Sequence, residues 1–420
     1  MSDVPSSAWR VPGFRNLWTA QSISLIGTQV TLLAFPVVAL TLLDGSALQV
    51  SLLAAVEFLP VLLFGLPAGA WVDRLPRRPV LIATDVVRAV ALSAVPIAYL
   101  FGVLDMTVLF VVAFLIGLGT LFFDVAQLSY LPALVAEDQL VDANGKLEVS
   151  RSVSQLAGPS AAGFLVQLVS GPIAIALDAL SYVASTVFLL RVPRDLHDAE
   201  RIESLGLRKE VWEGLRFVLA DRVMRPLVLA AAAAELAFAA VLALQIVYAV
   251  DTLHLSAGAV GVVLAVGNAG GLLGAVVCGV ATRRFGPGPA LVGAIAMFTV
   301  GAALLPLTTG AGGLAAALFV VYVGVVVFNI VQVTMCQTAT PARMLGRMNA
   351  TFRFVTWGMV PVGAAVGGLL VQPLGLRGVL WVAAAVLAVS ILPPLFSPVR
   401  SLKTYPAAAV PAAREAARES

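Results

Sequence analysis

The sequence predicts an all-α membrane protein with twelve transmembrane helices in two parallel six-helix repeats, and three observations support this prediction. Hydrophobic residues make up 60% of the 420 residues and charged residues only 12%, against about 25% charged residues in an ordinary soluble domain. Apolar runs long enough to cross a bilayer recur along the chain, and its two halves share a pattern of residues. A surface so poor in charge must largely face lipid.

A membrane-crossing helix needs about 20 mostly apolar residues, and twelve segments come close to this length. Six lie in the first half, at Leu17–Leu43, Val50–Val72, Pro79–Leu100, Thr107–Leu131, Val153–Val169 and Pro172–Leu190. Six lie in the second half, at Pro226–Val250, Gly258–Thr282, Pro289–Leu307, Leu314–Met335, Phe354–Val371 and Gly378–Phe396. Several are rich in glycine and alanine, which let neighbouring membrane helices approach closely.

The basic residues predict the orientation of these segments, because cytoplasmic loops are enriched in lysine and arginine. With the N-terminus inside, the cytoplasmic loops and both tails hold 24 of the 26 basic residues. Arg88 lies within a span, and only Arg377 lies outside. The polar N-terminus has no cleavable signal pattern, so the first span is expected to stay as an anchor. We therefore expect a multi-pass protein of the cell inner (plasma) membrane with both termini in the cytoplasm.

The longest loop divides the chain into two bundles. We expect a cytoplasmic N-terminal segment at 1–16, a first six-helix bundle at 17–190, a cytoplasmic central loop at 191–225, a second six-helix bundle at 226–397 and a disordered cytoplasmic tail at 398–420. The end of the central loop has an apolar stripe at helical spacing. Two interpretations stay open for it, a helix along the membrane surface and a solvated linker.

The two halves repeat each other without a gap over 45 residues. A shift of 205 positions places Phe123-Asp124 on Phe328-Asn329 and Gln127 on Gln332, and the same shift aligns Asn144 with Asn349. Because each repeat has six spans, both copies enter the membrane in the same direction. Parallel six-helix repeats related by an axis along the membrane normal describe one class of secondary transporter.

Ionisable residues inside membrane spans usually face a bundle interior or a watery cavity. The spans contain six of them: Glu57, Asp85, Arg88, Asp124, Asp178 and Glu235. Asp85 lies six residues from the cytoplasmic start of its helix, hence about 9 Å deep, and Asp124 lies at nearly the same depth. Arg88 shares a helix face with Asp85 at i, i+3. We predict an Asp85–Arg88–Asp124 cluster, either as a static pairing or as one that breaks and reforms during a transport cycle.

Glu57, Asp178 and Glu235 have no obvious basic partner at their depth. A carboxyl group without a cation partner in a low-dielectric bundle tends to bind a proton, which is what a proton-coupling site requires. Glu57 and Glu235 are therefore the proton-coupling candidates. The alternative is a neutral acid that hydrogen-bonds a neighbouring helix.

Uncharged polar residues also fall on matching helices of the two repeats. The candidates for lining a central cavity are Gln21, Gln29, Gln127, Gln245, Asn329 and Gln332. Hydrogen bonding between helices without any ligand is the alternative interpretation.

The loop between the second and third spans reads GAWVDRLPRRPVL. It resembles the loop signature of the major facilitator superfamily, G-x-x-x-D-R-x-x-R-R, through Gly69, Asp73, Arg74, Arg77 and Arg78. The resemblance implies that the glycine permits close helix contact. It also implies that the charged residues form a lock at the cytoplasmic side, broken when the transporter opens inward.

Two further stretches resemble superfamily motifs. The second-half copy of the loop keeps Gly279 and Arg284 but has Arg283 in place of the aspartate, so any lock there should be weaker. In the fifth span, AGPSAAGFL is similar to part of the glycine-proline signature of the superfamily's drug antiporters, through Gly158, Pro159 and Gly163.

Longer phrases narrow the branch of the superfamily. LIATDVVRA, FFDVAQLSYLPALV, ALDALSYVAS and EGLRFVLADRVMRPL resemble the branch of bacterial macrolide-efflux proteins and siderophore exporters. The resemblance implies a proton-coupled exporter of hydrophobic or amphipathic small molecules that works by alternating access. An importer or an uncoupled facilitator of the same superfamily is the first alternative.

A membrane-embedded enzyme or sensor is the alternative from another class, and the sequence argues against catalysis. His197 and His254 are the only histidines and lie in or beside loops, and no glycine loop followed by lysine could bind phosphate. Cys278 and Cys336 lie in separate apolar runs and predict no metal site. We expect no enzyme activity, no cofactor and, at a net charge of +3, no nucleic-acid partner. Two complete bundles in one chain favour a monomer.

Overall fold

The computed structural model describes residues 7–72, 74–136, 139–193, 215–341 and 344–406. Within these ranges the protein is helical and has no strand, so the predicted all-α class is confirmed. The first half contains α1 (Pro12–Thr41), α2 (Ala47–Val72), α3 (Arg77–Leu100), α4 (Met106–Leu134), α5 (Leu140–Val169) and α6 (Gly171–Leu189).

The second half contains α8 (Met224–Val247) with the π-helical turn η3 (Tyr248–Thr252), α9 (Ala257–Phe285), α10 (Pro287–Leu304), α11 (Ala311–Ala339), α12 (Leu345–Ser390) and α13 (Leu392–Leu395). Gly375 interrupts α12 with a φ of 70°, so two helices meet there. Only glycine adopts this left-handed conformation readily, and the residue lies between the last two predicted spans.

Helix lengths agree with a protein that crosses a membrane repeatedly. Ten of the described helices are long and apolar enough to do so, the tenth being Thr351–Leu395 with its break at Gly375. Each of the twelve predicted segments overlaps described helix, and none extends more than two residues beyond it. Helices α4 and α9 each have an N-cap residue whose side-chain oxygen accepts a backbone hydrogen bond. Asp105 accepts from the N–H of Val108 at 2.9 Å at the start of α4, and Ser256 accepts from the N–H of Ala259 at 3.3 Å at the start of α9.

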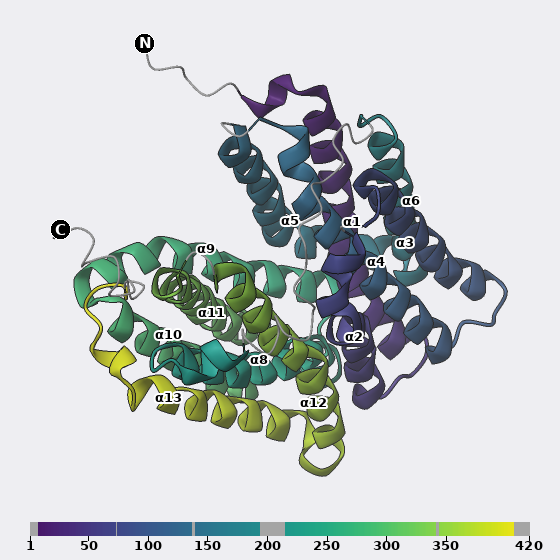
Figure 1. Cartoon of the computed structure of the whole chain (residues 1–420). Helices are drawn as coiled ribbons and strands as arrows, with labels where there is room; N and C mark the ends of the chain where they lie inside the picture. The colour runs from purple at the N-terminus through teal and green to yellow at the C-terminus, as the bar shows by residue number, and fades with distance from the viewer. Residues whose placement is uncertain (1–6, 73, 137–138, 194–214, 342–343, 407–420) are drawn as a thin grey trace.

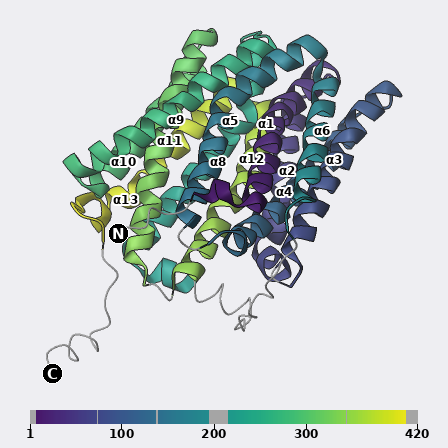
Figure 2. The ribbon, with the colours of Figure 1, turned by 90° about the horizontal axis from the view of Figure 1, so that it is seen from above.

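The helices form two groups that diverge from each other (Figure 1). Seen from above, α3, α4 and α6 lie on one flank and α9, α10 and α11 on the other, with α1, α5, α8 and α12 between them (Figure 2). The two halves pack together mainly through α2 on α12 and through α5 on α9.

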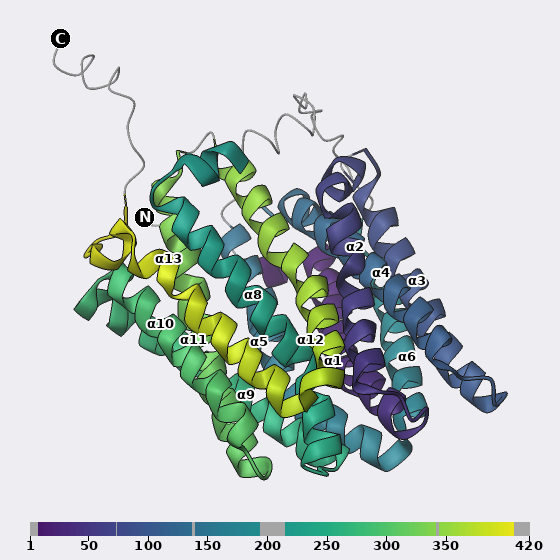
Figure 3. The same ribbon diagram turned by 90° about the horizontal axis from the view of Figure 1, so that it is seen from below.

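The described segments nearest the two chain ends, the start of α1 and the 3-10 helix η6 (Pro398–Ser401), lie toward the same end of the molecule (Figure 3). There the backbone N–H of Ala8 donates to Asp142 at the start of α5 (2.8 Å), and Asn16 donates to the carbonyl of Arg191 after α6 (3.3 Å). We call this the terminal end. The opposite end, with Gly102 between α3 and α4 and Ala257 at the start of α9, is the distal end.

Glycines allow the two halves to touch toward the distal end. A methyl group on Gly163 of α5 would overlap the carbonyl of Ala257, and one on Gly261 of α9 would overlap the carbonyl of Pro159. On the other side of the molecule, a methyl group on Gly368 of α12 would lie 2.6 Å from the Cβ of Ser51 in α2. The halves are therefore closed toward the distal end, and the helix groups diverge toward the terminal end (Figure 1).

The segment after the last helix differs from the sequence expectation of a disordered tail from residue 398. Pro398–Ser401 form the 3-10 helix η6, and Val399 is completely buried. The N–H of Gly288 donates to the carbonyl of Leu402 at 3.1 Å, which ties this segment to the start of α10. Burial of an apolar side chain and a backbone hydrogen bond explain the order that composition alone did not predict. The rest of the tail, 407–420, lies outside the described residues, as does 194–214 of the central loop.

Candidate functional site

A cavity of about 690 Å³ lies between the two halves. Residues of α1, α2 and α5 line it from the first half, and residues of α8, α9, α11 and α12 line it from the second. Its volume lies in the range that encloses a drug-sized ligand, roughly 300–1,000 Å³. Because helices of both halves form its wall, a change in their relative position must change its shape.

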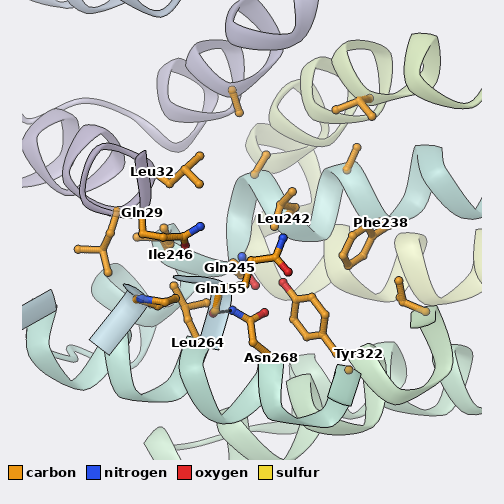
Figure 4. Close-up of a pocket in the computed structure, with 18 of the residues that line it drawn as sticks. Gln29, Leu32, Gln155, Phe238, Leu242, Gln245, Ile246, Leu264, Asn268 and Tyr322 are labelled. Carbon is orange, nitrogen blue, oxygen red and sulfur yellow. Dashed lines mark hydrogen bonds between the residues drawn. The ribbon is translucent and has the colours of Figure 1, made fainter. Parts of the chain in front are cut away.

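Uncharged polar side chains from both halves project from the cavity wall (Figure 4). Gln29 comes from α1, Gln155 from α5, Gln245 from α8, Asn268 from α9 and Tyr322 from α11. The amide of Gln245 interacts with the hydroxyl of Tyr322. These groups can donate and accept hydrogen bonds but have no net charge.

Most of the remaining wall is apolar, and part of it is aromatic. Phe35 of α1, Phe58 of α2 and Phe238 of α8 line the cavity. Phe238 and Tyr322 meet edge to face, with ring centroids 5.9 Å apart and an angle of 87° between the planes. Such a wall favours molecules with a large hydrophobic body.

Two carboxylates belong to the described lining of the cavity, Glu57 of α2 and Glu148 of α5. Glu57 is half-buried, and no described residue forms a hydrogen bond or an ion pair with it. Glu148 is exposed. The other proton-coupling candidate, Glu235, is half-buried on α8 one turn before Phe238 and Ala239, and it is not among the described lining residues.

Pro159, which lines the cavity, removes one backbone hydrogen bond from α5. Pro159 has no N–H, so the carbonyl of residue i−4, Gln155, loses its helical donor. The side-chain amide of Asn268, from the opposite half, donates to this carbonyl at 2.6 Å. Next to the proline, Gly158 faces the side chain of Gln29 and leaves no room for a methyl group.

A second group of polar residues lies inside the first half, away from the cavity. Arg88 forms a buried ion pair with Asp85, which also accepts a 2.5 Å hydrogen bond from Ser185. The guanidinium group lies between the rings of Phe123 and Tyr182, at 4.5 and 4.4 Å from their centroids. A carboxylate and two aromatic rings thus surround the guanidinium group, while its buried Nε has no hydrogen-bond partner among the described residues.

Asp124, the third member of the predicted cluster, is half-buried and makes no hydrogen bond or ion pair with the described residues. Its carboxylate interacts electrostatically with Arg88, with Arg151 of α5 and with Arg353 of α12. The structure therefore brings Asp85 and Arg88 together and leaves Asp124 nearby without direct contact.

Asp178, for which the sequence indicates no basic partner, accepts hydrogen bonds from Thr31 of α1 and Ser181 of α6. The hydroxyl groups of Thr28 and Tyr182, on the same two helices, form a separate hydrogen bond of 2.9 Å. The signal for this arrangement was the spacing of Thr28 and Thr31, which lie on one face of the first span.

At the terminal end, Asp73 of the predicted lock lies outside the described residues. Arg78 donates to the carbonyls of Leu189 and Leu190 at the end of α6, at 3.2 and 2.6 Å, and Arg77 is half-buried at the start of α3. Arg74 is exposed. No described atom lies within 4 Å of a methyl group placed on Gly69, so among the described residues no helix packs closely against that position.

The second copy of the loop lies at the terminal end of α9. A Cβ placed on Gly279 would lie 3.3 Å from the guanidinium of Arg283, which is its one described neighbour within 4 Å. Arg284 lies over the ring of Phe285, at 5.6 Å from the centroid. In this arrangement Arg284 has an aromatic partner.

Two of the six amide candidates are among the described lining residues of the cavity, and four are not. Gln29 and Gln245 line the cavity. Gln21 and Gln127 exchange two hydrogen bonds of 3.1 and 2.9 Å between α1 and α4. Asn329 is exposed, and Gln332 is buried. Gln155, Asn268 and Tyr322, which the sequence reasoning missed, line the cavity too, and the signal for them was the same: polar side chains within apolar spans.

A helical membrane protein whose two halves enclose a cavity between them, closed toward one end, has the architecture of a secondary transporter. The sequence profile of the major facilitator superfamily matches residues 17–361. The chain belongs to this superfamily and is a multi-pass membrane transport protein.

Curated relatives and solved structures agree with this class. Over 211 residues the chain is 30% identical to macrolide efflux protein A of Streptococcus pyogenes, covering 49% of this chain and 51% of the relative. It is 32% identical over 210 residues to the multidrug efflux pump Tap of Mycolicibacterium fortuitum, covering 48% and 51%. The chain thus matches about half the length of these curated relatives.

Among solved structures, a bacterial homologue of the iron transporter ferroportin in an inward-facing state has a TM-score of 0.75 at 18% identity, covering 93% of this chain and 99% of that one. The nucleoside transporter NupG has a TM-score of 0.75 at 12% identity, covering 91% and 98%. At such identities the likeness shows the fold only, and it confirms the predicted major facilitator fold.

Proposed function

We propose that this protein exports hydrophobic or amphipathic small molecules across the plasma membrane by alternating access, in exchange for protons. The single observation that supports this best is the cavity of about 690 Å³ between the halves, largely apolar and lined with a few polar groups. Its lining suits a lipophilic molecule with hydrogen-bonding groups. The efflux proteins named above are similar over about half of the chain, which favours export over import.

The proposed orientation places the terminal end in the cytoplasm. Basic residues concentrate in the loops and tails at that end, as expected for cytoplasmic segments. The distal contacts between α5 and α9 and between α2 and α12 then close the cavity toward the outside. Export would follow when the two bundles, residues 17–190 and 226–397, rock about the cavity, so that these contacts open and the cytoplasmic ends approach. One chain holds both bundles, so we propose a monomer.

The loop after α2 would hold the outward-open state. When the terminal ends approach, Asp73, Arg74, Arg77 and Arg78 would pair with groups beyond the loop, and Gly69 would permit the close contact. The second copy, with Gly279 and Arg284, has no aspartate and would contribute less. Near these loops, the Asp85–Arg88 pair is buried within the first bundle and would keep that bundle rigid.

Coupling to protons would use a carboxylate near the moving interface. Glu57 is in the cavity wall without a described partner, and Glu235 is half-buried one turn from cavity-lining residues of α8. Because neither is neutralised by a described cation, each can alternate between a protonated and an ionised form as the surroundings change.

Uptake into everted membrane vesicles with an acidic interior tests this function. A panel of lipophilic antibiotics and siderophores should include a compound that accumulates inside the vesicles, and a protonophore should abolish the accumulation. Vesicles without the protein are the control. If the compound accumulates to the same level with and without the protonophore, proton coupling is contradicted. If the compound exchanges across the membrane but does not accumulate, the protein is an uncoupled facilitator.

A further inference from the structure

The wall of the cavity is asymmetric in charge. Its described lining contains the carboxylates of Glu57 and Glu148 and no lysine, arginine or histidine. The amides and the phenol that face the same space are neutral and can bond to either sign of charge. An anion inside this cavity would meet negative charge without a counter-charge, whereas a cation would find a partner.

Glu57 is the better placed of the two acids. It is half-buried, whereas Glu148 is exposed to solvent, and water screens a charge pair at an exposed site. The other lining residues of α2 are Val50, Leu53, Ala54 and Phe58. Among the described lining residues of α2, Glu57 is thus the only ionisable one, and the other four are apolar.

The backbone holds Glu57 in a fixed place. A methyl group on Gly117 of α4 would overlap the carbonyl of Glu57, so α2 and α4 touch directly behind it. On the opposite side, Ala243 of α8 and Ala364 of α12 pack with Ala55. A charged group held on packed helices, rather than on a loop, can select a ligand by its position.

No described residue hydrogen-bonds or pairs with the Glu57 carboxylate. An ionised carboxylate in apolar surroundings is costly unless it gains a partner. The aromatic faces of Phe58 and Phe238, which line the same cavity, attract organic cations through their electron-rich surfaces. Both features point to the same kind of ligand.

We propose that Glu57 selects the charge of the substrate, and that the substrates are amphipathic monocations. The positive group would lie beside Glu57, and the hydrophobic body would fill the apolar and aromatic part of the cavity. This inference rests on the proposed function only in that the cavity holds the transported molecule. It depends neither on the direction of transport nor on proton coupling.

Two ions of nearly the same shape and opposite charge test the proposal. Tetraphenylphosphonium and tetraphenylborate should be titrated at equilibrium onto the full-length protein in lipid nanodiscs, with the signal of empty nanodiscs subtracted. The protein should bind the cation about tenfold or more tightly than the anion. Equal binding of both ions, or tighter binding of the anion, would overturn the proposal.

The variant Glu57→Gln removes the charge and keeps the size of the side chain. It should weaken binding of tetraphenylphosphonium about tenfold and leave tetraphenylborate unchanged or more tightly bound. Asp44→Asn is the matched control, because it removes one carboxylate from an exposed site of the same half. The positive φ of Asp44, 48°, suits asparagine equally well. A loss of cation binding that is the same in both variants would contradict a local role of Glu57.

Retained binding of tetraphenylborate shows that the Glu57→Gln cavity is intact, and Glu57→Asp, which keeps the charge, should keep the preference for the cation. Because no gradient is used, the result is independent of the vesicle assay. A protein that shows Glu57-dependent cation binding but no proton-driven uptake would retain this inference and lose the proposed function. A protein that shows proton-driven uptake but binds the cation and the anion equally tightly would retain the proposed function and lose this inference.

Discussion

Asn268 of α9 donates a 2.6 Å hydrogen bond to the backbone carbonyl of Gln155 in α5, and so joins the two halves of the molecule. That carbonyl is free because Pro159, four residues later, has no N–H to offer it. The second half therefore supplies the hydrogen bond that a proline in the first half removes. This contact exists only while α5 and α9 are close, as they are when the distal end is closed.

Replacing Asn268 by alanine should destabilise this closed arrangement. A hydrogen bond contributes about 0.5–1.5 kcal/mol, so the population of the distal-closed state should fall between about two- and tenfold relative to other states. Spin labels at positions 103 and 310, in distal loops of the two halves, would report the change as a longer distance distribution, in a background with Cys278 and Cys336 replaced by serine.

Pro159→Ala supplies the matched background for this measurement. Alanine restores the N–H, so the carbonyl of Gln155 regains a donor within α5 and no longer needs Asn268. The effect of Asn268→Ala should then be smaller than in the wild-type background. An equal shift with and without the proline would show that Asn268 acts in some other way.

The glycine contacts at the distal end should be sensitive to a single methyl group. In Gly261→Ala the new Cβ would overlap the carbonyl of Pro159 and lie 3.1 Å from the Cα of Gly163, so α5 and α9 must separate. We expect the same labels to show loss of the distal-closed distance. Gly293→Ala in α10 is the control, because no described atom lies within 4 Å of its Cβ position. An unchanged distance in Gly261→Ala would show that these glycines do not limit closure.

The fold could be predicted from the sequence because the bilayer imposes a length and a polarity on each helix. Even the break at Gly375 falls between two predicted spans. Depth along each helix was also predictable, since each residue adds a fixed rise. The superfamily followed from the loop signature around Gly69, and the sequence profile confirms it.

Rotation about each helix axis was not predictable in the same way. A helix that is apolar on all sides has no stripe to show which face meets the cavity. Gln21 and Gln29 lie two turns apart on α1, yet Gln29 lines the cavity and Gln21 bonds to Gln127 of α4. For Asp178 the sequence places one hydroxyl, Ser181, at i+3 on the same helix, but it does not show that Thr31 of another helix faces the carboxylate.

The buried ion pair gives a prediction on stability. Arg88→Met leaves Asp85 buried without a cation, which should cost about 3–5 kcal/mol. Adding Asp85→Asn should recover much of this loss, because an amide can still bond to Ser185. The midpoint of thermal unfolding in detergent, followed by fluorescence, would measure both effects.

The variants Arg88→Met and Asp85→Asn, alone and combined, form a double-mutant cycle, and the same cycle with Asp124→Asn in place of Asp85→Asn is the comparison. Asp124 lies near Arg88 without direct contact, so its coupling to Arg88→Met should be weaker than that of Asp85→Asn. Simple additivity for both aspartates would rule out a charge cluster. Stronger coupling for Asp124 than for Asp85 would mean that Arg88 spends most of its time on the other carboxylate.

The charged loop after α2 gives a prediction about the transport cycle. Asp73→Asn should reduce transport severely and leave membrane insertion intact, because it removes one partner from a charge cluster at the moving interface. Asp105→Asn, at the helix cap of α4, is a control for loss of one exposed carboxylate, since asparagine is also a good cap. Normal transport by Asp73→Asn at equal expression would leave the loop charges with a topological role only.

The last prediction separates the two coupling candidates. Export against a gradient needs an energy source, and a proton carrier must alternate between a protonated and an ionised form. Glu235 lies on the first helix of the second repeat, one turn from the cavity-lining Phe238. Glu235→Gln should abolish accumulation driven by a pH gradient and keep substrate exchange at equilibrium. If Glu57 is the carrier instead, Glu57→Gln should lose accumulation, together with the charge selectivity inferred above.

Uptake into everted vesicles measures accumulation when a pH gradient is imposed and equilibrium exchange when it is not, for each variant. If both variants accumulate substrate normally, neither residue carries the proton, and Asp124, half-buried and without a described hydrogen-bond partner, becomes the next candidate.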